Sequence, residues 1–98
     1  MTIVTQVRIR EGHEPAWDAA MRERIAVAKQ HPGFVGVQLC IPTEKLNERV
    51  IIGTWETRAD WEAWHSTQEF QETRARLEEP DSKTRQESWH EVVLAEHR

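Results

Sequence analysis

Along this chain the spacing of apolar residues switches between the period of two that is typical of strands and the period of 3.6 that is typical of helices. The order of these switches is the feature that most constrains the fold. In residues 3–9 apolar side chains recur at alternate positions, which predicts a strand with one face on a core. Pro15 then suits the first turn of a helix, where its missing N–H is not needed. The helix should run to about Gln30 and carry an apolar face made of Trp17, Met21, Ile25 and Ala28.

A hairpin should follow this helix. Pro32 disfavours helical geometry in the residue before it and Gly33 tolerates a left-handed turn, so the helix should end there. Residues 34–41 and 49–55 are typical of strands, and the short polar connection between them predicts an antiparallel pair. Alternation predicts that the first strand of the pair presents Val35, Val37, Leu39 and Ile41 on one face, with Phe34 and Cys40 on the other.

A second helical region begins at Thr57 or Arg58 and is expected to form two helices. Ser66-Thr67-Gln68-Glu69 matches a capping box in which Ser66 caps the second helix, so the two helices should meet near residues 65–66. The second helix should extend to residue 77 or 78. Residues 80–86 then resemble a polar loop, and residues 89–95 are expected to form the fourth strand.

Strand, helix, strand, strand, helix, strand is the ferredoxin-like order of an α+β protein. It predicts a four-stranded antiparallel sheet with the helices on one face. A chain of 98 residues is long enough for one core, so we expect a single domain over residues 1–98. The other sheet face would carry apolar residues without cover. A second copy is expected to supply that cover by sheet-to-sheet packing in a homodimer.

Charge and composition argue against several classes of partner for this protein. The chain has 17 acidic and 13 basic residues and no long basic run, which argues against a nucleic-acid partner. No stretch approaches the ~20 apolar residues of a membrane span, and the opening residues do not resemble a secretion signal, so we expect a cytoplasmic protein with no membrane partner. Cys40 is the only cysteine and the five His residues lack ligand spacing, so no metal site is expected.

Three short motifs resemble the antibiotic biosynthesis monooxygenase (ABM) family of the dimeric α+β barrel superfamily. They are Pro32-Gly33-Phe34 with Gly36, Gly53-Thr54-Trp55-Glu56, and Trp64 followed by Ser66 and Phe70. The likeness spans roughly residues 3–94 and implies two sheets packed face to face. It also implies a cleft between sheet and helices, used by family members either for cofactor-independent oxygenation of aromatic phenols or for binding and degrading haem.

The haem-degrading relatives carry an Asn on the first strand, a Trp on the second helical region and a His further along it. The shared motifs place these positions at Thr5, Trp64 and Arg74, so only the Trp is kept. A guanidinium has no lone pair for iron, and Arg74 therefore counts against haem chemistry. The resemblance to the oxygenases implies no cofactor.

Three residues are candidates for catalysis. Trp64 would stack on an aromatic substrate, or simply belong to the core. His65, four residues after Trp61, would act as a general base if it faces the cleft, or would lie in solvent. Thr5 is the polar member of an apolar strand face, and its hydroxyl would bond either to a ligand or to the backbone.

Three further residues are candidates for substrate binding. Trp61 would form part of the cleft wall with Trp64, and Phe70 belongs to the motif shared with the family. Arg74 would neutralise an anion at the cleft mouth, unless it lies in water like most helical Arg residues.

The sequence therefore predicts a homodimeric, cofactor-independent monooxygenase that acts on an electron-rich phenol or quinol. Two alternatives stay open at this point. One is a dimeric module that binds a small aromatic molecule without turnover, and the other is a relative that binds haem through His65.

Overall fold

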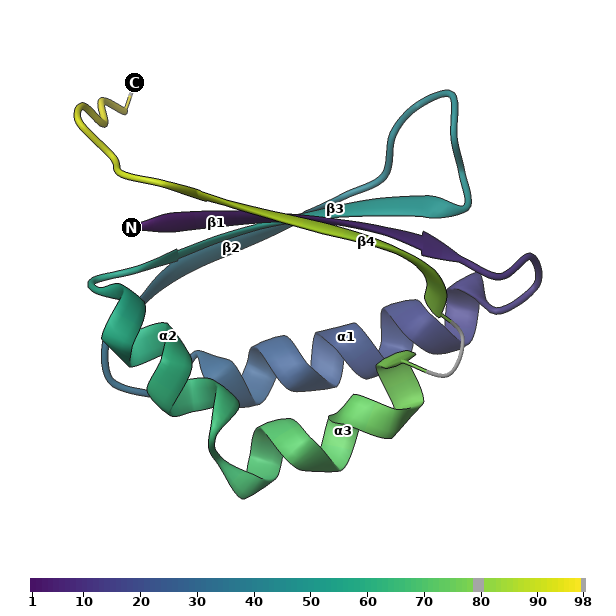
Figure 1. The fold of residues 1–98 in the computed structure, drawn as a ribbon, viewed down its shortest axis with the longest axis horizontal. Coiled ribbons are helices and arrows are strands. Elements are labelled where there is room, and N and C mark those ends of the chain that lie inside the picture. Colours follow the sequence, from purple (N-terminus) through teal and green to yellow (C-terminus); the bar gives the residue numbers. More distant parts are fainter. Residues whose placement is uncertain (79–80, 98) are drawn as a thin grey trace.

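A computed structural model describes residues 1–78 and 81–97 of the chain (Figure 1). The element order confirms the predicted α+β, ferredoxin-like arrangement. The bounds of the elements are β1 Thr2–Ile9, α1 Glu14–Ala28, β2 Phe34–Cys40, β3 Glu48–Trp55, α2 Arg58–His65, α3 Gln68–Glu78 and β4 Asp81–His90.

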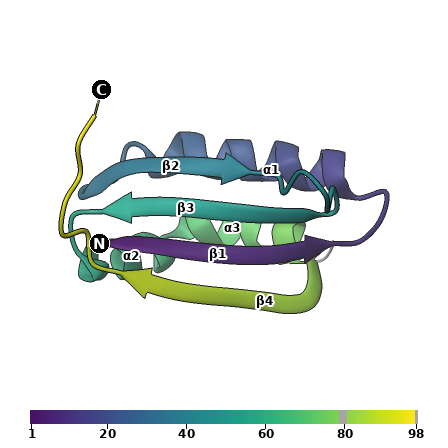
Figure 2. The same ribbon diagram turned by 90° about the horizontal axis from the view of Figure 1, so that it is seen from above.

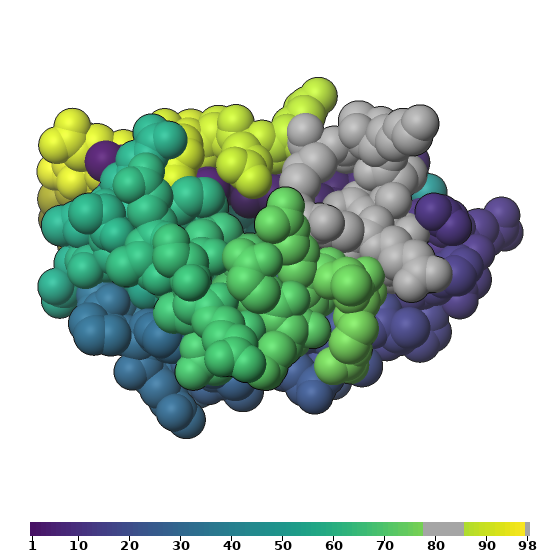
Figure 3. Space-filling view, turned by 60° about the horizontal axis from the view of Figure 1, so that its bottom comes forward, coloured from purple at the N-terminus to yellow at the C-terminus, as the bar shows by residue number. Residues whose placement is uncertain are grey.

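The four strands form one antiparallel sheet in the order β2-β3-β1-β4, with all three helices on the same side of it (Figures 1 and 2). From the helical side, α2 and α3 lie in front of the sheet (Figure 3). The alternation in β1 places Ile3, Val7 and Ile9 toward the helices, where each is at most 5% exposed. None of the described helices is long and apolar enough to cross a lipid bilayer.

The apolar face predicted for α1 is confirmed. Trp17 and Met21 are buried at one end of the helix and Ala28 at the other, while Ile25 between them is only partly buried. Trp17, at 1% exposure, packs into a core cluster with Val7 and Ile9. The spacing of four residues repeats often enough along α1 to keep one stripe on the sheet.

The prediction for the fourth strand is wrong. The strand is Asp81–His90, so most of the predicted polar loop lies in the strand, while Pro80 of that loop lies outside the described residues. β1 pairs with it over almost its whole length, from Thr2 opposite His90 to Ile9 opposite Asp81, with a register shift between Val7 and Ile9. β4 is an edge strand with a polar sequence, which lacks the alternation of apolar and polar residues by which a strand is recognised. The apolar run Val92-Val93-Leu94 follows the strand and is exposed.

The predicted faces of β2 are wrong at its start. Phe34 lies opposite Trp55 and Gly36 opposite Thr54, so Val35 is an extra residue that bulges out of the ladder. A β-bulge of this kind reverses the alternation on its two sides. Phe34 therefore turns toward the helices, where its ring meets that of Trp55 edge to face at 5.4 Å, and Val35 is 59% exposed.

The break between α2 and α3 is confirmed, but the predicted cap is wrong by one residue. Thr67 Oγ1 accepts a hydrogen bond from the backbone N–H of Phe70 at 3.2 Å and so caps α3. Ser66 instead donates its hydroxyl to the carbonyl oxygen of Glu62 within α2. The same Thr67 hydroxyl donates to the carbonyl oxygen of Trp64 at 2.7 Å, which ties the end of α2 to the start of α3.

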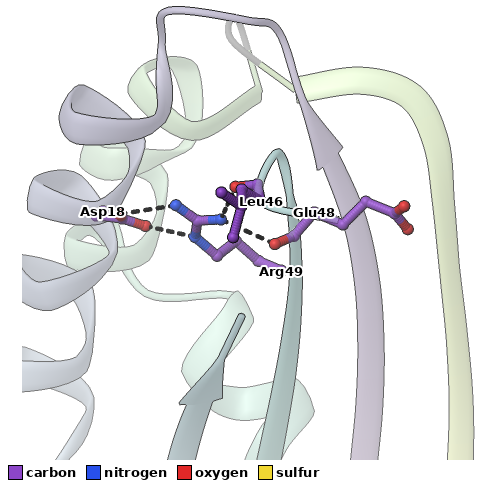
Figure 4. A network of polar contacts seen from close by, with 4 residues as sticks. All are labelled: Asp18, Leu46, Glu48 and Arg49. Atoms are coloured by element: carbon purple, nitrogen blue, oxygen red, sulfur yellow. Dashed lines mark hydrogen bonds and ion pairs between the residues drawn. The ribbon is translucent and has the colours of Figure 1, made fainter. Parts of the chain in front are cut away.

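An ion pair between a buried Arg and a partly exposed Asp joins α1 to β3 (Figure 4). The Arg49 side chain is only 4% exposed and binds both carboxylate oxygens of Asp18, at 2.8 and 3.0 Å. Its Nη1 donates to the carbonyl oxygens of Leu46 and Glu48. The hydrogen bond to Asp18 raises the pKa of Arg49 above its ordinary value, although burial acts in the opposite direction. The guanidinium is thus charged and held by groups from three places in the chain.

We predict that Asp18→Asn lowers the free energy of unfolding by about 3 kcal/mol, since it leaves a buried guanidinium without its counter-charge. Chemical denaturation at one fixed chain concentration measures this. Glu62→Gln is the matched control, because Glu62 pairs with Arg58 on an exposed surface and its loss should cost at most about 1 kcal/mol. Equal losses for the two variants would contradict the prediction.

Candidate functional site

A cavity of about 330 Å³ lies between the sheet and the helices. This volume lies in the lower part of the ~300–1,000 Å³ range of small-molecule sites. β1, β2 and β3 supply its floor, and all three helices contribute to its other walls. The residues of these strands that line the cavity are Ile3, Thr5, Phe34, Val37, Ile51, Gly53 and Trp55.

The cavity opens between α3 and β4. Of the residues that line it, Gln71 and Arg74 on α3 and Glu87 on β4 are the exposed ones among those described. Figure 3 faces this side, and purple atoms of β1 are visible between the green surface of α2 and α3 and the yellow-green β4. The mouth is therefore polar and the interior mostly apolar.

All six residues predicted for the site line this one cavity, namely Thr5, Trp61, Trp64, His65, Phe70 and Arg74. Thr5 is 7% exposed on the floor, because the alternation of β1 turns it the same way as Ile3 and Val7. Arg74 lies at the mouth. Trp64 is 4% exposed and belongs to a core cluster. It also lines the cavity, so it lies where both a core residue and a residue of the cleft wall would lie.

An aromatic wall, made of Trp61, His65, Phe70 and Trp64, lines the helical side of the cavity. The His65 ring lies between those of Trp61 and Phe70, with centroid distances of 3.6 and 4.0 Å. Trp64 meets Phe70 edge to face at 5.7 Å. Trp61 and Trp64 come from α2 and Phe70 from α3, so the turn capped by Thr67 brings the wall together.

The position of the ring proton on His65 follows from its hydrogen bond. Nδ1 lies 2.8 Å from the carbonyl oxygen of Trp61, one turn earlier in α2. A carbonyl oxygen can only accept, so Nδ1 carries the proton. In the neutral ring Nε2 is then the basic nitrogen.

Two further residues of the cavity were missed in the sequence. Arg24 is 8% exposed, donates from Nε to Thr73 Oγ1 at 2.9 Å and from Nη2 to the carbonyl oxygen of Phe70 at 3.2 Å, and stacks on the Phe70 ring. Arg24 lies three residues after Met21 and four before Ala28, which places it on the apolar face of α1. This spacing is the feature of the sequence from which its burial could have been predicted. Glu87 was missed because the fourth strand was expected to start two residues later.

The charges of the cavity favour an anionic aromatic ligand. Arg24 places a positive charge against the wall, where a low dielectric strengthens its effect on a bound anion. Arg74 and Glu87 bring opposite charges to the mouth. Within residues 1–78 and 81–97, no three His, Cys, Asp or Glu side chains lie close enough together to hold a metal ion.

Comparisons with known proteins place this geometry in a family. Residues 1–76 match the family model of the antibiotic biosynthesis monooxygenases. No curated protein sequence matches the chain.

Solved structures share the fold over nearly the whole chain. A protein from Nitrosomonas europaea assigned to antibiotic biosynthesis monooxygenases superposes with a TM-score of 0.89 at 14% identity, covering 94% of this chain and 88% of its own. SnoaB from Streptomyces nogalater, a cofactor-independent oxygenase, gives a TM-score of 0.82 at 19% identity, covering 97% and 96%. A Bordetella bronchiseptica protein with the same assignment as the first gives 0.83 at 20%, covering 95% and 96%.

The match to the family model covers well over half of the chain, and the solved structures assigned to that family share its fold. The chain belongs to the antibiotic biosynthesis monooxygenase family.

Proposed function

We propose that this chain is a cofactor-independent monooxygenase that oxidises an electron-rich phenol or quinol in the cavity between sheet and helices. The observation that carries the proposal is the aromatic wall in which His65 lies between Trp61 and Phe70 with its Nδ1 proton bonded to the backbone. SnoaB, which shares the fold, is a cofactor-independent oxygenase, and this agrees with the proposal.

The chemistry makes few demands on the protein. A phenol or quinol that loses a proton becomes an anion that can itself reduce O₂. One oxygen atom enters the ring system and the other leaves as water, with all electrons supplied by the substrate. The protein must exclude water, accept the proton and stabilise the anion.

His65 suits the role of proton acceptor. Because the Trp61 carbonyl oxygen holds the proton on Nδ1, the ring has one defined tautomer with Nε2 as the base. Contacts with two neighbouring rings, both tilted relative to it, restrict the orientation of the imidazole. A base held this way needs no reorientation before it takes a proton.

The remaining roles belong to groups on both sides of the cavity. Trp64, Trp61 and Phe70 would stack on the substrate rings, and Thr5 on the floor would donate its hydroxyl to the developing oxyanion. Arg74 at the mouth, with Arg24 in the wall, would supply the positive charge that favours the anion.

The proposal includes a homodimer. The outer sheet face carries Val4, Ile52, Val50 and Cys40, which are all only partly buried in one chain. None of the three described helices covers this face (Figure 2). A second copy that packs its own outer face against it would remove this apolar surface from water.

We predict that Trp64→Ala lowers the rate of O₂ consumption with an anthrone-like or quinol substrate by about 100-fold or more, because the ring is no longer positioned. Trp64→Phe should keep part of the rate. Trp17→Phe is the control, since Trp17 is buried away from the cavity lining and its change should leave turnover intact. If wild-type protein never exceeds the uncatalysed rate with any phenol, the binding-module function replaces this one.

We predict that His65→Ala lowers turnover by about 10²- to 10⁴-fold and flattens the rate-against-pH profile near neutrality, as expected when a general base is removed. Nitrogen NMR of the wild-type protein should show Nδ1, not Nε2, protonated in the neutral ring. His13→Ala, at an exposed turn, is the control. A wild-type pH profile in His65→Ala would exclude it as the base.

We predict a homodimer at micromolar concentration, measured by sedimentation equilibrium. Ile52→Lys should shift the equilibrium to monomer, since it places a charge in the centre of the outer sheet face. Ala75→Lys, on the exposed side of α3, should leave the dimer unchanged. A wild-type species of 11.5 kDa throughout the range would disprove sheet-to-sheet pairing.

A further inference from the structure

The guanidinium of Arg24 is fixed against one ring of the aromatic wall. Arg24 lies on α1 and is 8% exposed. Its Nε donates to Thr73 Oγ1 at 2.9 Å and its Nη2 to the carbonyl oxygen of Phe70 at 3.2 Å. Its Cζ lies 3.9 Å from the centroid of the Phe70 ring. Because an Arg side chain stays charged at any pH that a protein survives, the wall carries a permanent positive charge.

The Phe70 ring is shared between this guanidinium and the imidazole of His65. The centroids of the two rings lie 4.0 Å apart. Since Arg24 and His65 each lie about 4 Å from the same ring centroid, the two groups are at most about 8 Å apart. Both line the cavity, where water screens charges less than it does on an open surface. The charge of Arg24 therefore disfavours a second positive charge on the imidazole.

The other contacts of the imidazole act in the opposite direction. Trp61 and Phe70 present aromatic rings to it, and such rings attract a cation. The hydrogen bond from His65 Nδ1 to the Trp61 carbonyl oxygen is also stronger when the ring is charged. Without an opposing group, these contacts would favour the imidazolium, which has no free nitrogen to accept a proton.

The remaining charged groups around His65 lie nearer to solvent. Among the described residues that line the cavity, Arg74 on α3 and Glu87 on β4 bring opposite charges to the exposed mouth. The lining residues of β1, β2 and β3 are uncharged. On α2 itself, Glu62 is exposed and pairs with Arg58. Arg24 is thus the buried charge among the described lining residues.

We infer that Arg24 is a positioning residue that keeps His65 in its neutral form near neutral pH, through the Phe70 ring that both side chains contact. A general base must be unprotonated when its substrate binds. The inference rests on the proposed function for the role of His65 as that base. The protonation state of the ring can be measured without any substrate.

The experiment follows the ring signals of His65 by NMR during a pH titration at one fixed ionic strength. His65→Ala identifies the signal among those of the five His residues. In Arg24→Met the titration midpoint should rise by about one pH unit, the order expected when one of two unit charges about 8 Å apart is removed from a partly buried site. In Arg24→Lys the charge remains while the planar fork is lost, so the midpoint should stay within about 0.3 unit of wild type.

Two further variants complete the comparison. Arg76→Met is the matched control, because it removes an exposed charge of α3 that pairs with Glu23 on α1 and does not line the cavity. The His65 midpoint should not move in this variant. If Arg24→Met does not fold, Arg24→Gln removes the same charge and must show the same rise. With turnover, the acid limb of the rate-against-pH profile should move to higher pH by the same amount as the midpoint.

Three results would overturn the inference. One is a midpoint in Arg24→Met at or below that of wild type. Another is an equal rise in Arg24→Lys, which would assign the effect to geometry and not to charge. The third is an equal rise in Arg76→Met. The expected rise in a protein that consumes no O₂ would preserve this inference and reject the oxygenase function, whereas turnover with an unmoved midpoint would do the reverse.

Discussion

The site depends on the way one layer of helices covers a twisted sheet. The buried apolar residues form two clusters, one around Trp17, Val7 and Ile9 and the other around Trp55 and Trp64. Helices and sheet are packed closely at these two places, and the cavity is lined by Met21 of the first cluster and by Ala28, Trp55 and Trp64 of the second. Trp side chains supply much of the apolar contact between helices and sheet in both clusters, and the cavity lies beside these contacts.

Much of this fold could be predicted from the sequence, because the spacing of apolar residues reflects which face of a strand or helix is buried. β1 and α1 each bury one regular stripe, and their patterns predicted them correctly. β4 is different, since a strand at the sheet edge is held by backbone hydrogen bonds to β1 that leave no mark on side-chain polarity. The Val35 bulge is likewise a matter of register, which depends on the partner strand and not on the local sequence.

In the candidate site, too, residues marked by a local sequence pattern could be predicted, whereas residues whose position depends on distant partners could not. Trp64 and Phe70 could be selected from the family resemblance and His65 from its helical spacing after Trp61, and all three line one cavity. Arg24 was missed because a charged residue on an apolar helix face is expected to reach water along its aliphatic stem. Its contacts with Thr73 and Phe70 come from α3, some 46 to 49 residues away in the chain, and no local pattern predicts them.

The hydrogen bond between His65 Nδ1 and the Trp61 carbonyl oxygen is internal to α2, a helix of eight residues. The Trp61 carbonyl lies one helical turn before His65, so the imidazole reaches it only while this short helix keeps its geometry. The regularity of α2 therefore selects the tautomer of the imidazole. A substitution that frays α2, even at an exposed position that does not line the cavity, would release the imidazole proton to either nitrogen and so weaken the base without replacing any lining residue.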